Sequence, residues 1–132
     1  MVIIDTSAWI EFFRPSGNLA IKKLVRYALE NESVGIGDLI YCEILQGTKN
    51  KDEYNTLKYL LDGLRKFDMV GFSIAEKSAE NYRNLRSMGI TVRKTIDVLI
   101  ATFCMEHDYY LIHNDSDFDL IKSALSLETF VN

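Results

Sequence analysis

The sequence predicts an α/β protein in which helices cover both faces of a parallel sheet. Short apolar runs of strand length alternate along the chain with longer segments whose apolar residues recur at helical spacing. The first run, Val2–Ile4, has the wholly apolar character of a strand that is buried on both faces. The chain has 132 residues, one proline and no linker-like stretch, so residues 1–132 are expected to form a single domain around one core.

The elements follow in chain order from these patterns and from the residues at their ends. Strands are expected at the apolar runs 2–4, 33–36, 67–72, 109–112 and 128–131. Helices are expected at the segments 6–13, 18–29, 38–47, 52–64, 73–86, 95–106 and 117–124. Asp38 is placed to cap the third helix, which ends near Gly47. Ser73 and Glu76 form a capping box that opens the fifth helix.

The charge balance permits a polyanionic substrate without predicting one. The formal net charge is −4, which is unusual for a nucleic-acid-binding protein. The acids Asp5, Glu43, Asp97 and Asp115 account for this excess, so the rest of the chain is neutral. Basic residues gather just before Asp97, at Arg83, Arg86, Arg93 and Lys94.

The sequence favours a soluble cytoplasmic protein. No basic segment of the kind that opens a secretory signal precedes the first strand. The longest apolar stretch, 96–105, is interrupted by Asp97 and is too short to cross a bilayer. Cys42 and Cys104 lie in helical patterns without a C-x-x-C pair, so both are expected to be buried and reduced. A zinc site is therefore not expected.

Four short acidic motifs carry the functional prediction. Asp5, Glu43, Asp97 and the pair Asp115 and Asp117 lie at the edges of apolar runs, where an unpaired carboxylate is costly. A partner that several carboxylates can share is a hard divalent cation such as Mg²⁺ or Mn²⁺. Asp5 follows the first strand and Asp115 the fourth, which places both at the carboxyl edge of the sheet, where sites of open α/β sheets form.

Each acid also has a structural interpretation. Glu43 is equally explained as a solvated glutamate at the margin of its helix. Asp97 lies in a first helical turn, where the helix dipole favours a negative charge. One of Asp115 and Asp117 is explained by capping of the last helix, and His113 by an ordinary structural histidine. The core stripe of the helix that carries Asp97 is expected to consist of Ile96, Leu99, Ile100, Phe103 and His107.

Other hydrolytic chemistries lack their residues. The chain has no G-x-S-x-G motif and no glycine-rich phosphate loop. Ser7 occupies the position at which an aspartate-based phosphatase would need a second aspartate. The segment from Asp115 has Leu120 and Ser126 where an EF-hand needs glycine and glutamate. Metal-assisted hydrolysis is the chemistry that remains.

The ordered set of motifs resembles the PIN-domain ribonucleases, and in particular the VapC toxins of bacterial and archaeal toxin–antitoxin pairs. The resemblance rests on VIIDTSAW at 2–9, the helix that contains Glu43, IDVLIA at 96–101 and NDSDF at 114–118. It extends over essentially the whole chain. It implies a three-layer α/β/α fold with a parallel five-stranded sheet in the order 3-2-1-4-5.

The same resemblance implies a site, a cofactor and partners. The implied catalytic acids are Asp5, Glu43, Asp97 and Asp115, and the implied ligands of Mg²⁺ or Mn²⁺ are Asp5, Asp97, Asp115 and Asp117. Such an ion activates water and neutralises charge on a phosphodiester, so no covalent nucleophile is needed. The implied partners are an RNA substrate such as tRNA or ribosomal RNA, a cognate antitoxin and a second copy of the chain, without a membrane.

Substrate contacts are expected at Thr6, Arg93, Lys94 and His113. Arg93 and Lys94 lie within a helical turn of Asp97, where they can contact flanking phosphates, although an ordinary solvated loop explains them equally well. His113 stands where the family often has Thr or Ser. Two other functions stay open: a non-catalytic interaction module that uses the acids to bind a partner, and a metal-dependent phosphatase or phosphotransferase.

Overall fold

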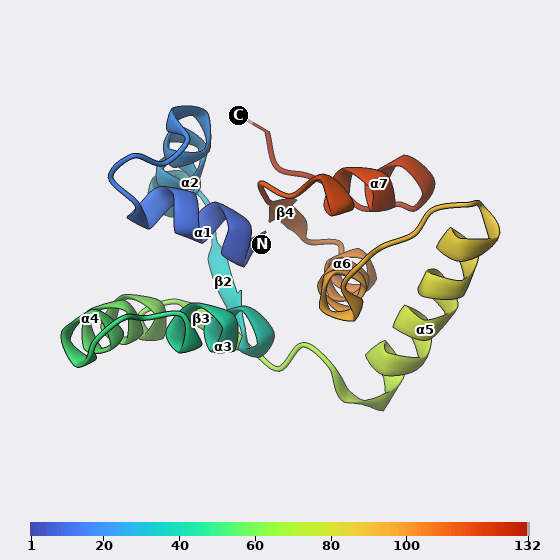
Figure 1. Ribbon diagram of the computed structural model, residues 1–132, viewed down its shortest axis with the longest axis horizontal. Helices are drawn as coiled ribbons and strands as arrows, with labels where there is room; N and C mark the ends of the chain where they lie inside the picture. Colours follow the sequence, from blue (N-terminus) through green and yellow to red (C-terminus); the bar gives the residue numbers. More distant parts are fainter. Residues whose placement is uncertain (132) are drawn as a thin grey trace.

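The computed structural model describes residues 1–131 as a parallel sheet with helices on both sides (Figure 1). The elements in chain order are β1 (Val2–Ile4), α1 (Thr6–Phe13), α2 (Leu19–Asn31), β2 (Val34–Gly37), α3 (Asp38–Gln46), α4 (Lys51–Asp62), β3 (Arg65–Phe67), α5 (Gly71–Ser87), α6 (Thr95–His107), β4 (Tyr110–Ile112) and α7 (Ser116–Ala124). Among these residues, no helix combines the length and the apolar character that a membrane span requires.

The sheet has the predicted strand order, with one strand fewer than expected. Its four strands are all parallel and run in the order β3-β2-β1-β4. The segment 128–131 lies beside β4, in the place of the expected fifth strand, but forms a single bridge between Leu111 and Thr129. Leu111 makes both backbone hydrogen bonds to this segment, one to Glu128 and one from Phe130. Two bonds are too few to extend the ladder.

The core forms where the helices meet the central strands. β1 is the most deeply buried strand, and Ile3 and Ile4 have no exposed surface. In Figure 1, α1 and α2 lie to one side of β4, and α6 and α7 lie to the other. Phe103 of α6 packs its ring against Phe67 and Tyr109, with centroids 5.8 and 5.9 Å apart. These contacts hold α6, and with it Asp97, against the sheet.

Three local predictions were wrong. The expected strand at 67–72 lies earlier, at β3, and α5 begins at Gly71, which has φ of +79°, rather than after a capping box at Ser73. The cause is a long-range contact, because the Asp38 carboxylate accepts a hydrogen bond from the Met69 N–H at 3.0 Å. Gly37, not Asp38, therefore occupies the N-cap position of α3. 

The cysteines divide into one correct and one wrong prediction. Cys104 is buried as expected, and this burial raises the pKa of its thiol to about 12. Cys42 is exposed, since the buried residues of α3 are Ile40, Ile44 and Leu45 on other sides of the helix.

We expect the turn between α1 and α2 to reject any side chain at Gly17. A Cβ atom at Gly17 would lie 1.9 Å from the Glu11 carbonyl oxygen, so Gly17→Ala must displace backbone. Overpacking of this kind typically lowers the free energy of unfolding by about 1–3 kcal/mol. Urea unfolding measures it, with Gly63→Ala as the control, because the nearest atom to a Cβ there is 3.4 Å away. Equal stability of the two variants would contradict this account of the turn.

Candidate functional site

Three aspartates from two separate segments converge beyond the carboxyl end of the sheet. One carboxylate oxygen each from Asp97, Asp115 and Asp117 lies within 4.8 Å of the other two. Asp97 comes from the first turn of α6, and the other two come from the start of α7. Asp97 and Asp117 are only 5% and 4% exposed. The fold thus brings together acids that are about 20 residues apart in sequence and buries two of them.

Asp5 reaches the same edge from the end of β1. Its backbone N–H donates to the Ile112 carbonyl at 2.9 Å, which ties the end of β1 to the end of β4. Its Oδ2 atom accepts hydrogen bonds from the N–H of Ser7 at 2.9 Å and from the Ser7 hydroxyl at 2.6 Å, so Asp5 also caps α1. The neighbours of β1 are β2 on one side and β4 on the other, so the strand order reverses here, as expected for a site of this fold class.

A single hydroxyl connects Asp5 to the turn that carries Asp115. Ser7 Oγ donates to Asp5 and accepts the N–H of Asn114 at 2.9 Å. Asp115 then caps α7, because its Oδ1 atom accepts the N–H of Asp117 at 2.9 Å. The orientation of each acid is therefore fixed by the helix that follows it: Asp5 by the first turn of α1 and Asp115 by the first turn of α7.

His113 contacts this turn from the other side. Its Nδ1 atom accepts the N–H of Asp115 at 3.2 Å, and its ring packs on Phe118 with centroids 5.2 Å apart. Its Nε2 atom lies 3.6 Å from Asp119 Oδ1. Burial lowers the pKa of His113, which favours the neutral ring that can accept at Nδ1. These contacts give His113 a place in the support of Asp115, and its contact with substrate stays a prediction.

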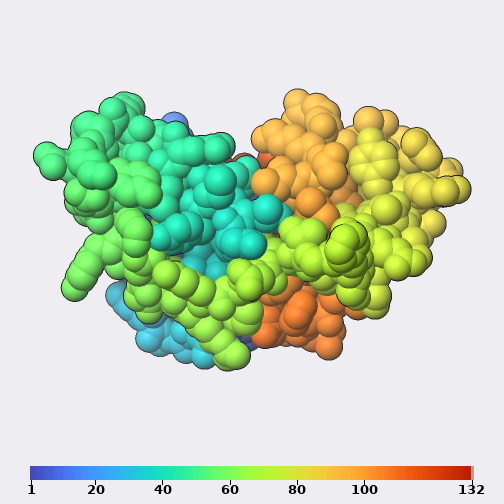
Figure 2. All heavy atoms as spheres, turned by 90° about the horizontal axis from the view of Figure 1, so that it is seen from below, coloured from blue at the N-terminus to red at the C-terminus, as the bar shows by residue number. Residues whose placement is uncertain are grey.

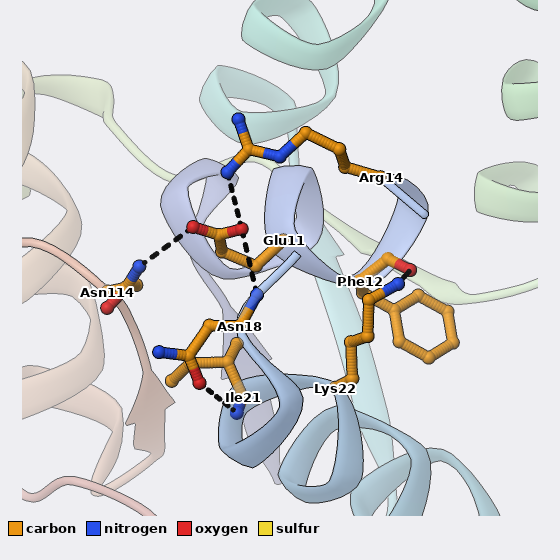
Figure 3. A network of polar contacts seen from close by, with 7 residues as sticks. All are labelled: Glu11, Phe12, Arg14, Asn18, Ile21, Lys22 and Asn114. Carbon is orange, nitrogen blue, oxygen red and sulfur yellow. Dashed lines mark hydrogen bonds and ion pairs between the residues drawn. The ribbon is translucent and has the colours of Figure 1, made fainter. Parts of the chain in front are cut away.

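Glu11 is a residue of the site's surroundings that the sequence patterns did not reveal. Figure 3 shows its carboxylate between Arg14, the backbone of Asn18 and the Asn114 side chain, at 2.6, 3.2 and 3.3 Å. It therefore links the α1–α2 turn to the turn before α7. The spacing of four residues between Ser7 and Glu11 places both on one face of α1, and this spacing was the available sequence signal.

Glu43 joins the acids from the opposite wall. Thr6 Oγ1 donates to Glu43 Oε1 at 2.8 Å, which connects α1 to α3. Burial and the charge of Asp5 raise the pKa of Glu43, while the Thr6 hydrogen bond and Lys94 lower it. A solvated glutamate at a helix margin would have neither this bond nor this coupling. Figure 2 shows the surface notched between α3 and the segment that leads into α6.

The acids repel one another, and this repulsion indicates the kind of ligand that they could share. Burial and, to a smaller extent, the charges of Asp5, Asp115 and Asp117 raise the pKa of Asp97 to about 7, although Lys94 lowers it. Burial likewise raises the pKa of Asp5. Among residues 1–131, the Oδ2 atoms of Asp97 and Asp117 are buried without a hydrogen-bond partner. Buried carboxylate oxygens without partners fit a hard divalent cation. For Asp97, stabilisation by the helix dipole alone does not explain why one of its oxygens is buried without a partner.

The basic pair lies beside these acids. Arg93 Nε is 3.6 Å from Asp117 Oδ2, and its side chain is 75% exposed. Lys94 is close enough to lower the pKa of both Asp97 and Glu43. Both cations therefore lie at the rim of the acid cluster, and their contact with substrate stays a prediction.

We expect Asp97→Asn to flatten the pH dependence of stability in EDTA. Because folding raises the Asp97 pKa from 3.8 to about 7, the folded chain holds a proton that the unfolded chain releases. This contribution is complete below about pH 4 and is lost as the pH rises to about 7. Asparagine cannot titrate, so the stability of the variant relative to wild type should grow between pH 4 and 7. Urea unfolding at pH 5 to 8 measures it, with exposed Glu80→Gln as control, and parallel curves for Asp97→Asn and wild type would refute the assignment.

Comparisons with known proteins agree with this architecture. The family model described as PIN domain matches residues 2–123. VapC ribonuclease Mb1587 of Mycobacterium bovis and Ribonuclease VapC11 of Mycobacterium tuberculosis are each 36% identical over 130 residues, which cover 97% of this chain and 96% of theirs.

Solved structures share the fold at lower identity. A chain of VapBC2 from Rickettsia felis, bound to a DNA fragment from its promoter, has a TM-score of 0.77 at 17% identity and covers 98% of both chains. A chain of a toxin-antitoxin complex from Klebsiella pneumoniae has a TM-score of 0.68 at 22% identity, over 89% of this chain and 90% of that one. The chain belongs to the PIN domain family and, within it, to the VapC ribonucleases that it matches along nearly its whole length.

Proposed function

We propose that this protein is a metal-dependent endoribonuclease that acts as the toxin of a toxin–antitoxin pair. The observation that carries the proposal is the convergence of Asp97, Asp115 and Asp117 within 4.8 Å, where two buried oxygens have no hydrogen-bond partner among residues 1–131. The VapC relatives named as ribonucleases support RNA as the substrate. Structured RNA, tRNA or ribosomal RNA, is the class that we propose.

The acids have different roles in the proposed hydrolysis. Asp97, Asp115 and Asp117, together with Asp5, would hold Mg²⁺ or Mn²⁺. When bound, such an ion supplies the Lewis acidity that activates water and offsets negative charge on a phosphodiester. Ser7 keeps Asp5 oriented through two hydrogen bonds, so this ligand needs little reorganisation.

Glu43 is the residue that we propose to move a proton. Its Oε1 atom is held by Thr6, and its raised pKa brings it closer to the range in which a carboxylate exchanges protons near neutral pH. It would accept the proton of the attacking water at Oε2. The water oxygen then bonds to phosphorus, the bond from phosphorus to one ribose oxygen breaks, and that oxygen takes up a proton.

The partners follow from the same proposal. Arg93 and Lys94 would contact phosphates that flank the cleaved bond, and Thr6 and His113 remain candidates for substrate contact. A cognate antitoxin would bind this protein, since the similar chain from Klebsiella pneumoniae is part of a toxin-antitoxin complex. We further propose a homodimer that acts in the cytoplasm, where RNA and antitoxin are both present.

We expect cleavage of tRNA or ribosomal RNA by the purified protein to require Mg²⁺ or Mn²⁺ and to stop in EDTA. Asp5→Asn and Asp97→Asn should each lower kcat/KM by two orders of magnitude or more, since loss of even an outer-shell partner of a metal site costs about 10–100-fold. Gel-based cleavage assays measure this, and exposed Glu80→Gln serves as the charge-matched control.

Three results would count against this function. Equal cleavage by wild type and both aspartate variants would indicate a contaminating nuclease. Calorimetry that finds no binding of Mg²⁺ or Mn²⁺ at millimolar concentration would indicate a non-catalytic interaction module. Turnover of small phosphoesters without any action on RNA would indicate a phosphatase or phosphotransferase.

We expect the double variant Arg93→Ala/Lys94→Ala to bind RNA more weakly and with less dependence on salt. Each phosphate contact to single-stranded RNA contributes about 0.7 to the slope of log K against log salt, so the slope should fall by about 1.4. Fluorescence anisotropy in EDTA from 50 to 300 mM KCl measures it, and Lys23→Ala on α2 provides the control. An unchanged slope would assign both residues to the ordinary solvated surface.

A further inference from the structure

We propose that the groove between α1, α3 and α4 binds an unpaired nucleotide of the RNA next to the phosphodiester that is cleaved. This inference rests on the proposed ribonuclease function and adds the substrate's conformation to it. The groove has a volume of about 410 Å³, within the range of ligand pockets in proteins. The residues that matter for the argument are Thr6, Ile10, Phe13, Arg14, Lys49 and Leu57.

The groove opens onto the acid cluster. Its inner end is formed by Thr6 and Glu43, which are joined by the 2.8 Å hydrogen bond between α1 and α3. Thr6 directly follows Asp5, and the charge of Asp5 acts on Glu43. An RNA strand with a phosphate at the aspartates therefore has both this groove and the pair Arg93 and Lys94 close to it.

The wall of the groove suits the face of a base. Ile10 is 50% exposed and, with Phe13 and Leu57, gives the groove a contiguous apolar wall. Phe13 is held in place by Trp9, with centroids 5.4 Å apart and planes 12° from parallel, so this part of the wall is fixed before binding. Leu57 of α4 closes the opposite side. Only an unpaired base offers its face to such a surface, because in a duplex the faces are stacked.

The rim of the groove suits phosphate. Arg14 is oriented by its 2.6 Å contact with Glu11, which uses one nitrogen of the guanidinium and leaves its other donors for a ligand (Figure 3). Lys49 is exposed at the loop between α3 and α4. Glu53 also lines the groove, but its carboxylate accepts the N–H of Lys49 at 2.9 Å and lies in the first turn of α4. Two cations at the rim favour a polyanion over an apolar protein segment.

The test compares groove variants with matched variants outside it. Ile10→Ser is paired with Phe72→Ser, since Phe72 is 96% exposed on α5, and Lys49→Ala is paired with Lys23→Ala on α2. The probes are a fluorescein-labelled unstructured RNA 12-mer and the same strand annealed to its complement. Anisotropy in EDTA gives Kd, cleavage in Mg²⁺ gives kcat and KM, and circular dichroism melts confirm that each variant folds.

We expect Ile10→Ser to raise Kd and KM for the single strand about 5-fold or more, because the base loses an apolar surface against which to bury its face, with no effect on the weaker binding of the duplex. Lys49→Ala should lower the salt slope by about 0.7. Because Lys49 is exposed, this variant tests the groove even if Ile10→Ser unfolds.

Two outcomes would overturn the inference. If the groove variants bind and cleave the single strand as well as their paired controls do, the groove does not bind a nucleotide. If the groove variants still bind RNA but no longer bind a co-expressed antitoxin, the groove is a binding site for protein and not for RNA. Failure of the wild-type protein to cleave any RNA would instead refute the proposed function, while the anisotropy comparison would still decide whether the groove binds a single strand.

Discussion

The central constraint on this structure is the mutual repulsion of the carboxylates that the fold brings together, because the rest of the fold must overcome it. Asp97 and Asp117 are buried with an oxygen that has no hydrogen-bond partner among the described residues, and the other acids oppose the ionisation of Asp97. Such an arrangement survives only because stronger constraints fix its members. Asp5 and Asp115 are each held by the backbone N–H groups of the helix that they cap, at the ends of neighbouring parallel strands. Strand pairing and helix capping thus supply the rigidity that a charged cluster cannot supply itself.

Sequence patterns predicted the features that depend on local order. Asp5 and Asp115 follow apolar strands directly, so their place at one edge of the sheet could be inferred, and the strand order came from the family resemblance. Burial of Asp97 was harder to predict, because α6 is enclosed on more than one side. Asp97, Val98, Ala101 and Cys104 are buried, whereas Ile96 and Leu99 of the expected core stripe are only half-buried. 

The remaining errors have a common physical origin in contacts between distant residues. The bond from Met69 to Asp38 spans 31 positions and moves the start of α5, and the bond from Asn114 to Glu11 spans 103 positions. No periodic pattern in the sequence predicts either of these two contacts. Such contacts reveal themselves only when the elements are already placed in space, which is why the support of the site was less predictable than the acids that form it.

The acids are also distributed along the whole length of the chain. Asp115 and Asp117 follow Asp5 by 110 and 112 residues along the chain. A growing chain that has not yet released α7 from the ribosome lacks two of the three oxygens that converge at the site. If the protein is a toxin, its acid cluster is therefore incomplete until α7 has been synthesised. The order of the acids along the chain thus leaves an interval, before the cluster is complete, in which an inhibitor can be synthesised.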